Sequence, residues 1–156
     1  NIGKNKTDVW EERIKEINPD CIVKKITKHL DIYNTCQLFD EKIDYIVDCC
    51  DTIEVKKQLI RESIKRNIKL ISSMGTGYKM DPSKLKIMDL RKTSYDPIAK
   101  ILRKMLRDEK INKKIMVICS DEVNIIKKQK TIGSNCFVPS IAGLLCASYV
   151  INDIVR

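Results

Sequence analysis

Two aspartates, Asp48 and Asp51, directly follow the apolar run Tyr45-Ile46-Val47, which is too short for a helix and rich in β-forming residues. A helical pattern begins at about Thr52 and ends at Arg66, so the run is predicted to be a buried parallel strand. In open α/β sheets, ligands bind beyond the carboxyl ends of the strands. Two carboxylates there, beside a helix N-terminus, suit a magnesium ion that carries nucleotide phosphates. The structural alternative is that Asp48 closes the strand and Asp51 caps the helix.

The composition is that of one globular domain with a strong positive charge. The chain has 156 residues, and 30 Lys and Arg against 21 Asp and Glu give a formal net charge of +9. This excess makes a polyanion a serious candidate partner. No apolar run approaches the roughly 18 residues that span a bilayer, so we expect no membrane segment. The first residues also lack a signal-peptide pattern, and the chain is predicted to start within a domain.

The seven cysteines argue against a disulfide framework and against a zinc site. Their number is odd, most lie within apolar runs, and the sequence contains no Cys-x-x-Cys pair. They are therefore predicted to be reduced, buried thiols of a cytoplasmic protein. Cys49 and Cys50 are adjacent, but neighbours on a strand point to opposite faces, which disfavours a redox pair.

The elements alternate along the chain in the order expected for an α/β fold with right-handed crossovers and a parallel sheet. Helices are predicted over residues 8–17, 31–39, 52–66, 97–107 and 139–155, and strands over residues 21–26, 43–48, 68–71, 85–90 and 115–119. The 115–119 strand is the expected return of the 85–90 strand. The small-residue loop from Ser72 to Gly77 favours a tight connection over a phosphate cradle, because it lacks the spacing of a dinucleotide fingerprint or a P-loop.

The densest positive surface is the polar face of the helix that Pro97 opens. Lys100, Arg103, Lys104 and Arg107 lie on it, opposite an apolar stripe. A track for RNA phosphates is the functional hypothesis, and a solvated helix face is the structural one. No aromatic residues are interleaved, so base stacking has little support here. A further loop is predicted around Lys127, Lys128 and Lys130.

Three stretches together resemble the E1-like adenylyltransferase superfamily of the ThiF/MoeB/HesA type, over nearly the whole chain. They are Gly3-Lys4-Asn5-Lys6 with its helix and Asn18-Pro19, the strand-tip segment Asp48-Cys49-Cys50-Asp51, and Asp89-Leu90-Arg91-Lys92-Thr93-Ser94-Tyr95-Asp96-Pro97. The last stretch, and Ser120-Asp121-Glu122, are similar to the branch that acts as tRNA threonylcarbamoyladenosine dehydratase.

The resemblance implies an ATP-dependent enzyme that adenylylates the threonylcarbamoyl carboxylate of a tRNA adenosine and cyclises it. Lys6 would contact the ATP phosphates, and Asp51 would lie near Mg²⁺ and the adenylylated group, with Asp48 as a further nucleotide ligand. Asp51 would also be the catalytic carboxylate. It could not act alone, because the growing negative charge has to be neutralised by the ammonium group and the metal ion. A homodimer is expected as well.

The resemblance also has a large gap. The family's glycine-rich loop, its acidic ribose ligand and one arginine are not found in residues 1–156. The chain is therefore predicted to be the C-terminal part of a Rossmann-like E1-type domain, a single incomplete domain over 1–156. Parallel strands would be followed by antiparallel strands, with helices on both faces. Such a piece should not turn over ATP alone.

Two other functions stay open from the sequence. One is activation of a ubiquitin-like sulfur-carrier protein, for which only Cys119 and Cys136 could serve as the catalytic cysteine, and neither stands in a motif. The other is a basic α/β module that binds a partner and catalyses nothing.

Overall fold

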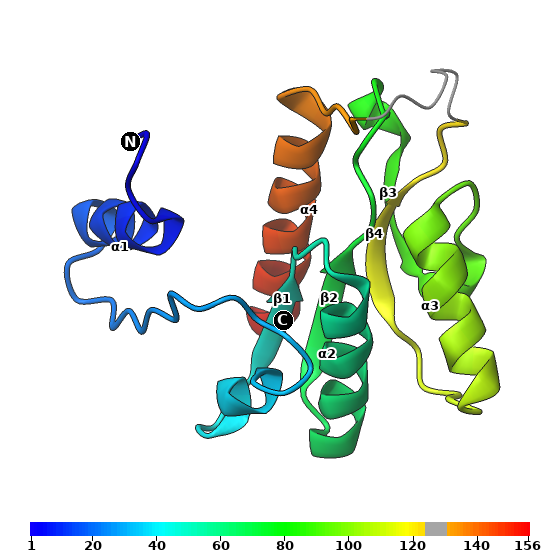
Figure 1. Cartoon of the computed structure of the whole chain (residues 1–156), viewed down its shortest axis with the longest axis horizontal. Helices are drawn as coiled ribbons and strands as arrows, with labels where there is room; N and C mark the ends of the chain where they lie inside the picture. Colours follow the sequence, from blue (N-terminus) through cyan, green and yellow to red (C-terminus); the bar gives the residue numbers. More distant parts are fainter. Residues whose placement is uncertain (124–130) are drawn as a thin grey trace. The chain divides into compact units, whose positions relative to one another are not determined.

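The computed structural model describes residues 1–123 and 131–156, and the predicted loop around Lys127, Lys128 and Lys130 lies outside them. The described chain divides into two compact units, residues 1–30 and residues 31–156 (Figure 1).

The first unit contains one regular element, the helix α1 (Lys6–Ile17). Its charged face is tied down by Lys25, whose Nζ lies 2.9 Å from Asp8 Oδ1 and 2.6 Å from Glu11 Oε2. The strand predicted over residues 21–26 is wrong, because the segment has no regular structure. A strand is stable only when neighbouring strands satisfy its backbone groups.

The second unit is built on a sheet of the strands β1 (Tyr45–Asp48), β2 (Lys69–Ser73), β3 (Leu85–Asp89) and β4 (Met116–Ser120). Among the described residues the strand order is β1-β2-β4-β3. β1 and β2 are parallel, as are β2 and β4, whereas β3 runs antiparallel to β4. The predicted parallel strands, the antiparallel return and the α/β class are confirmed.

Helices cover both faces of this sheet (Figure 1). One face carries α2 (Ile53–Arg66) and α3 (Pro97–Asp108), and the other carries α4 (Phe137–Ile154). In the described part of the chain, three short 3₁₀ helices lie in the connections, at η1 (Thr35–Phe39), η2 (Pro82–Lys84) and η3 (Leu90–Lys92). The helix predicted over residues 31–39 is thus a shorter 3₁₀ turn.

The helix ends follow local side-chain chemistry. α2 begins after Thr52, so the prediction that Asp51 caps it is wrong, and it ends at Asn67, which adopts a left-handed conformation with φ of 55°. The side chain of Asp96 accepts a hydrogen bond of 2.7 Å from Ala99 N and caps α3. α4 starts two residues before Pro139 because Asn135 Oδ1 accepts hydrogen bonds from the first backbone N–H groups.

The cysteines are less buried than predicted. All seven lie in the described ranges and are free thiols, but only Cys119 and Cys146 are buried. Cys146 belongs to the core between α4 and the sheet, together with Ile71, Ile118 and Val138. The cysteines of loops and helix ends, such as Cys36 and Cys136, are exposed.

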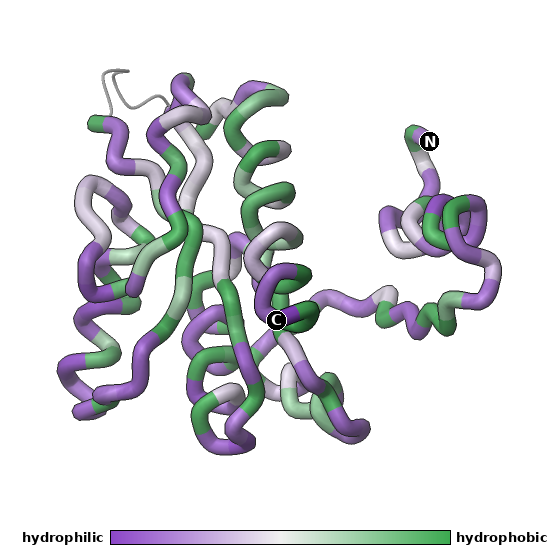
Figure 2. Tube along the Cα trace, turned by 180° about the vertical axis from the view of Figure 1, so that it is seen from behind, coloured by the Kyte–Doolittle hydropathy of each residue, from purple (hydrophilic) through white to green (hydrophobic). Residues whose placement is uncertain are grey.

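α4 is the most apolar helix of the chain, as its colouring in Figure 2 shows. It is the one helix among the described residues with the length and composition to cross a membrane, contrary to the sequence prediction. Its side toward the sheet buries Val138, Ala142 and Cys146. Because core helices of globular proteins meet the same criterion, this is weak support for a membrane segment.

Candidate functional site

The carboxyl ends of β1 and β2 lie side by side, with Asp48 opposite Ser72 in the parallel register. Asp48 is buried, and both of its carboxylate oxygens are occupied. Oδ2 accepts hydrogen bonds from Ser72 Oγ (2.6 Å) and Lys56 Nζ (3.0 Å), and Oδ1 accepts one from Cys50 N (3.1 Å). The prediction that Asp48 is a direct nucleotide ligand therefore disagrees with its geometry, since its oxygens face protein donors.

Lys56 is the partner that sequence reasoning missed. Its side chain is 1% exposed, and its ammonium donates to Asp48, to Ser72 Oγ (3.2 Å) and to the carbonyl oxygen of Ser73 (2.8 Å). All three N–H groups are thereby satisfied. The ion pair joins the end of β1, the first turns of α2 and the end of β2. The available signal was the position of Lys56 next to the buried stripe that contains Val55 and Leu59.

Asp51 has the opposite environment. It lies three residues after Asp48, in the short loop between β1 and α2, and it is exposed. Its carboxylate does not point into packed protein, so it remains accessible to a ligand or metal ion. The Cys50 N–H that donates to Asp48 belongs to the residue before Asp51, which means that the buried pair fixes the loop that presents Asp51.

The two cysteines of this loop have different partners. The side chain of Cys49 hydrogen-bonds with Cys146 of α4, which lowers the pKa of Cys49 to about 7. Burial and the hydrogen bond from Cys50 Sγ to Asp48 (3.0 Å) raise the pKa of Cys50 to about 12.

The small-residue loop after β2 is a tight connection, as favoured from the sequence. Gly75 N donates to Asp96 Oδ2 (3.1 Å), and a Cβ at Gly75 would lie only 2.9 Å from that oxygen. Asp96 therefore joins this loop to the start of α3, and burial raises its pKa.

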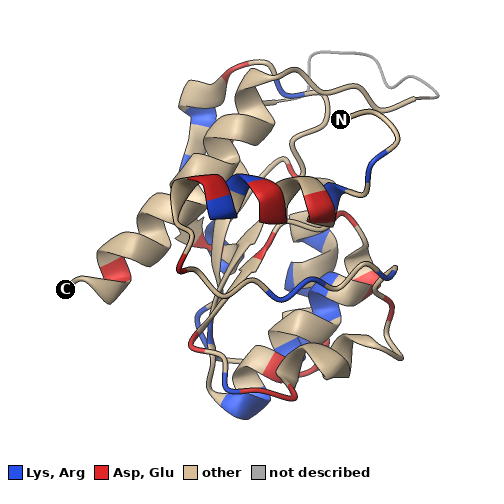
Figure 3. Cartoon of the chain, turned by 90° about the vertical axis from the view of Figure 1, so that its left-hand side faces the viewer, with Lys and Arg blue, Asp and Glu red and all other residues tan. Residues whose placement is uncertain are grey.

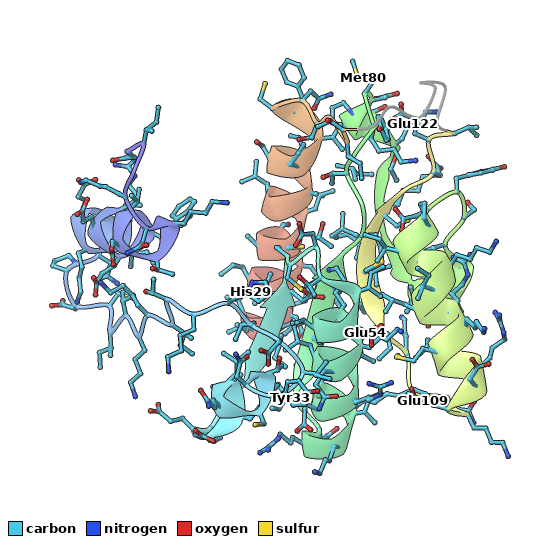
Figure 4. All side chains as sticks on the ribbon, viewed as in Figure 1. His29, Tyr33, Glu54, Met80, Glu109 and Glu122 are labelled. Carbon is cyan, nitrogen blue, oxygen red and sulfur yellow. The ribbon has the colours of Figure 1, made fainter. Side chains whose placement is uncertain are left out.

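The Ser-Asp-Glu segment at the end of β4 organises the loop that precedes η2. The Glu122 carboxylate accepts hydrogen bonds from the N–H groups of Met80 and Asp81 at 3.0–3.1 Å. The buried ammonium of Lys79 donates to the carbonyl oxygen of Glu122. Figure 4 shows Met80 and Glu122 together at the edge where the parallel strands end. Glu122 thus holds the loop before η2 through hydrogen bonds to its backbone.

Lys6 is exposed at the first position of α1, in the first compact unit. Its role as an ATP ligand stays a prediction. No group of three or more His, Cys, Asp or Glu side chains that could hold a metal ion occurs in residues 1–123 and 131–156. Mg²⁺ commonly uses only one or two protein carboxylates together with substrate phosphates, so the single exposed carboxylate of Asp51 fits a nucleotide-bound Mg²⁺.

The predicted basic face is present on α3, with one exception. Lys100, Lys104 and Arg107 are exposed. Arg103 is half-buried, and its guanidinium donates to Thr93 Oγ1. Arg103 thus braces the connection before α3 and contributes less to the exposed positive surface than predicted.

Comparison with known proteins places these features in context. The model of the ThiF family matches residues 1–150. The tRNA threonylcarbamoyladenosine dehydratase of Bacillus subtilis (strain 168) is 40% identical over 172 residues, covering 99% of this chain and 68% of the relative. The tRNA threonylcarbamoyladenosine dehydratase 2 of Saccharomyces cerevisiae is 35% identical over 133 residues, covering 84% of this chain and 30% of the relative.

Solved structures agree in fold. The E. coli tRNA N6-threonylcarbamoyladenosine dehydratase TcdA in complex with ATP has a TM-score of 0.88 and 26% identity, covering 99% of this chain and 65% of that one. The complex with AMP gives the same TM-score and covers 66% of that chain. This chain therefore spans about two thirds of the length of the Bacillus subtilis and E. coli proteins, and its match covers about a third of the yeast one.

Proposed function

The chain belongs to the ThiF family, and from this premise we propose that it is part of an ATP-dependent tRNA threonylcarbamoyladenosine dehydratase. The observation that carries the proposal is the 40% identity to the Bacillus subtilis dehydratase over nearly the whole chain. The names of the relatives favour this function over activation of a ubiquitin-like sulfur carrier. ATP is the proposed cosubstrate because TcdA has been crystallised with it.

The proposed reaction has two steps. The threonylcarbamoyl carboxylate attacks the α-phosphate of ATP, and pyrophosphate leaves. A nitrogen of the same side chain then attacks the acyl carbon of the adenylate, AMP leaves with the bonding electron pair, and the nitrogen loses its proton. The net change in the nucleoside is the loss of one water molecule.

We assign Asp51 to the Mg²⁺ ion and the reacting phosphate, and Lys6 to the ATP phosphates. Mg²⁺ would supply charge neutralisation at the α-phosphate. Asp48 and Lys56 would act on the site indirectly, because their buried ion pair holds the loop that carries Asp51. Asp48 is therefore a positioning residue in this proposal.

We also propose that further polypeptide completes the sheet. β1 is an edge strand among the described residues, and its Val47 is 47% exposed. An uncovered parallel edge is uncommon in α/β proteins. The family's glycine-rich nucleotide-binding segment would pair along this edge, beside Asp51.

Two partners follow from the surfaces. The exposed cations Lys100, Lys104 and Arg107 of α3 are proposed to contact tRNA phosphates. A second copy of the protein is proposed to cover the outer face of α4, where Figure 3 shows few charges. The exposed large apolar side chains of α4 are Phe137, Ile141, Leu144, Ile151 and Ile154. We place the protein in the cytoplasm, in keeping with its free thiols.

The test of the proposed function is genetic. Deleting the gene should remove cyclic threonylcarbamoyladenosine from cellular tRNA and leave the uncyclised nucleoside in its place, as measured by mass spectrometry of tRNA digests. Unchanged amounts of the cyclic nucleoside would contradict the proposal. Complementation with an Asp51→Asn variant should fail, and complementation with a variant of an unrelated exposed residue, Asp44→Asn, should succeed.

A further inference from the structure

A pocket of about 350 Å³ lies at the end of the sheet where the parallel strands begin. Asp51 lies at the other end, where these strands finish. The residues that begin β1, β2 and β4, namely Tyr45, Lys69 and Met116, line it. This volume lies in the range of roughly 300–1,000 Å³ that is usual for small-molecule sites. None of the residues assigned above to ATP or to the α3 basic face lines this pocket.

Two aromatic rings and three lysines meet in this pocket. Tyr45 comes from β1 and Tyr149 from α4, and both line the pocket. Both rings pack against the hydrophobic core, so they have little freedom to move. The lysines are Lys69, Lys113 and Lys114. Lys69 forms an ion pair of 2.7 Å with Asp153, which also lines the pocket, so the charge of Lys69 is balanced there. The sequence shows no aromatic residue among its basic runs, but the fold brings these two tyrosines to the lysines.

The lysine-bearing turn is held in one conformation. The guanidinium of Arg91 donates to the carbonyl oxygens of Lys113 (3.0 Å) and Ile111 (2.6 Å). Lys113 Nζ in turn donates to Asn67 Oδ1 (2.9 Å). A turn that only carries solvated charge needs no such bracing. Fixing these groups before binding lowers the entropy that a ligand must offset.

The same turn connects the pocket to the basic face of α3. A second depression of about 640 Å³ is lined by Arg91, Arg103, Arg107 and Lys110, and by Ile111 and Asn112. The next two residues of the chain, Lys113 and Lys114, line the first pocket. Glu109, labelled in Figure 4, marks the end of α3 at which this turn begins. Positive side chains therefore continue from α3 to the two tyrosines.

We propose that the Tyr45–Tyr149 pocket binds one unpaired nucleotide of an RNA whose neighbouring phosphates follow Lys114 and Lys110 toward α3. The proposal rests on the proposed function, which supplies RNA as the partner. Aromatic side chains that line positively charged grooves bind unpaired bases by stacking, and every base offers a flat face for this contact. Lysines contact the phosphates without reading sequence. The pocket is a binding subsite and takes no part in the adenylylation chemistry.

The experiment measures binding of the 156-residue chain to a fluorescein-labelled stem-loop RNA with an unpaired loop by fluorescence anisotropy, at several salt concentrations. A blunt, fully paired RNA duplex of similar length is the comparison ligand. Tyr149→Leu should weaken stem-loop binding by roughly 5- to 150-fold, the usual effect of losing one stacking ring. Tyr149→Phe keeps the ring and should retain most of the affinity. Duplex binding should change little in either variant.

The lysine arm of the experiment does not depend on the packing of the core. Lys114→Ala should reduce the slope of log affinity against log salt by about 0.7, the value for one phosphate contact on a single strand. Lys84→Ala removes the same charge from an exposed lysine at the other end of the sheet and should leave the slope unchanged. Circular dichroism checks that each variant is folded, and photocrosslinking of 4-thiouridine RNA should label Tyr45 or Tyr149.

Three results would overturn the inference. They are an equal reduction of the salt slope by Lys84→Ala and Lys114→Ala, crosslinks that avoid both tyrosines, and no detectable RNA binding by the chain. The cyclisation assay separates this inference from the proposed function. If tRNA is cyclised but the pocket variants bind RNA normally, the pocket assignment is wrong and the enzyme assignment stands. If the pocket variants lose RNA binding but the gene deletion leaves the cyclic nucleoside unchanged, the pocket assignment stands and the enzyme assignment is wrong.

Discussion

Replacing Lys56 by methionine removes the counter-charge of a carboxylate that water does not reach. The Lys56 and Asp48 side chains are 1% and 0% exposed, and 3.0 Å separates Nζ from Oδ2. Removing one partner of a buried ion pair costs about 3–5 kcal/mol, because the other charge stays buried. Ser72 and Cys50 still donate hydrogen bonds to Asp48 in the variant. We therefore expect the free energy of unfolding to fall by about 3 kcal/mol, the lower end of that range.

Urea denaturation followed by circular dichroism measures this change. Tryptophan fluorescence is unsuitable, because Trp10 belongs to residues 1–30 and Lys56 to the other compact unit. A loss of this size should also lower the midpoint of thermal unfolding by roughly 6–12 °C.

The neighbouring lysine offers a matched control. Lys57 forms an ion pair of 2.7 Å with Glu54, whose side chain is 60% exposed, so Lys57→Met should cost at most about 1 kcal/mol. The double variant Asp48→Leu with Lys56→Met removes both buried charges and should cost less than the sum of the two single changes. Our reasoning would be refuted if Lys56→Met and Lys57→Met had the same effect.

Three further predictions concern the site and its surroundings. The rate of Cys49 alkylation should rise with pH through a midpoint near pH 7, because the thiolate is favoured above a pKa of about 7. Cys146→Ala should move this midpoint toward pH 9. Mass spectrometry of iodoacetamide-labelled peptides measures both midpoints. Asp96→Asn should lower the free energy of unfolding by about 1–3 kcal/mol, since an amide that caps α3 would turn its N–H₂ group toward Gly75 N–H. Urea denaturation measures this change, and the surface variant Asp44→Asn is the matched control. Asp51→Asn should leave the thermal midpoint of the chain within about 2 °C of wild type, because an exposed carboxylate contributes little to stability.

The sequence predicted the sheet well because its signals are local. The apolar run at Tyr45, the helical period up to Arg66 and the helix start at Pro97 each specify their element without distant partners. The exposure of Asp51 beyond β1 also agrees with the sequence, since strand order alone places it at the ligand-binding edge.

The errors come from contacts between distant residues. Whether an aspartate at a strand tip faces solvent or a buried lysine depends on the helix packed beside it, so the sequence did not reveal that Asp48 pairs with Lys56. Apolar sequence neighbours also do not bury a cysteine unless another element covers it. The meeting of Tyr45 and Tyr149, 104 positions apart, follows only from the packing of α4 against the sheet.

The most direct test of the central claim is a reaction with purified components. The protein expressed from its complete reading frame is incubated with Mg²⁺, ATP and tRNA that carries threonylcarbamoyladenosine, and the nucleosides are analysed by mass spectrometry. We predict ATP-dependent loss of one water molecule from that nucleoside, with AMP and pyrophosphate as co-products, and no ATP–pyrophosphate exchange by residues 1–156 alone. An unchanged nucleoside with the complete protein would contradict the proposed function, and exchange by the 156-residue chain would contradict the proposed incomplete domain.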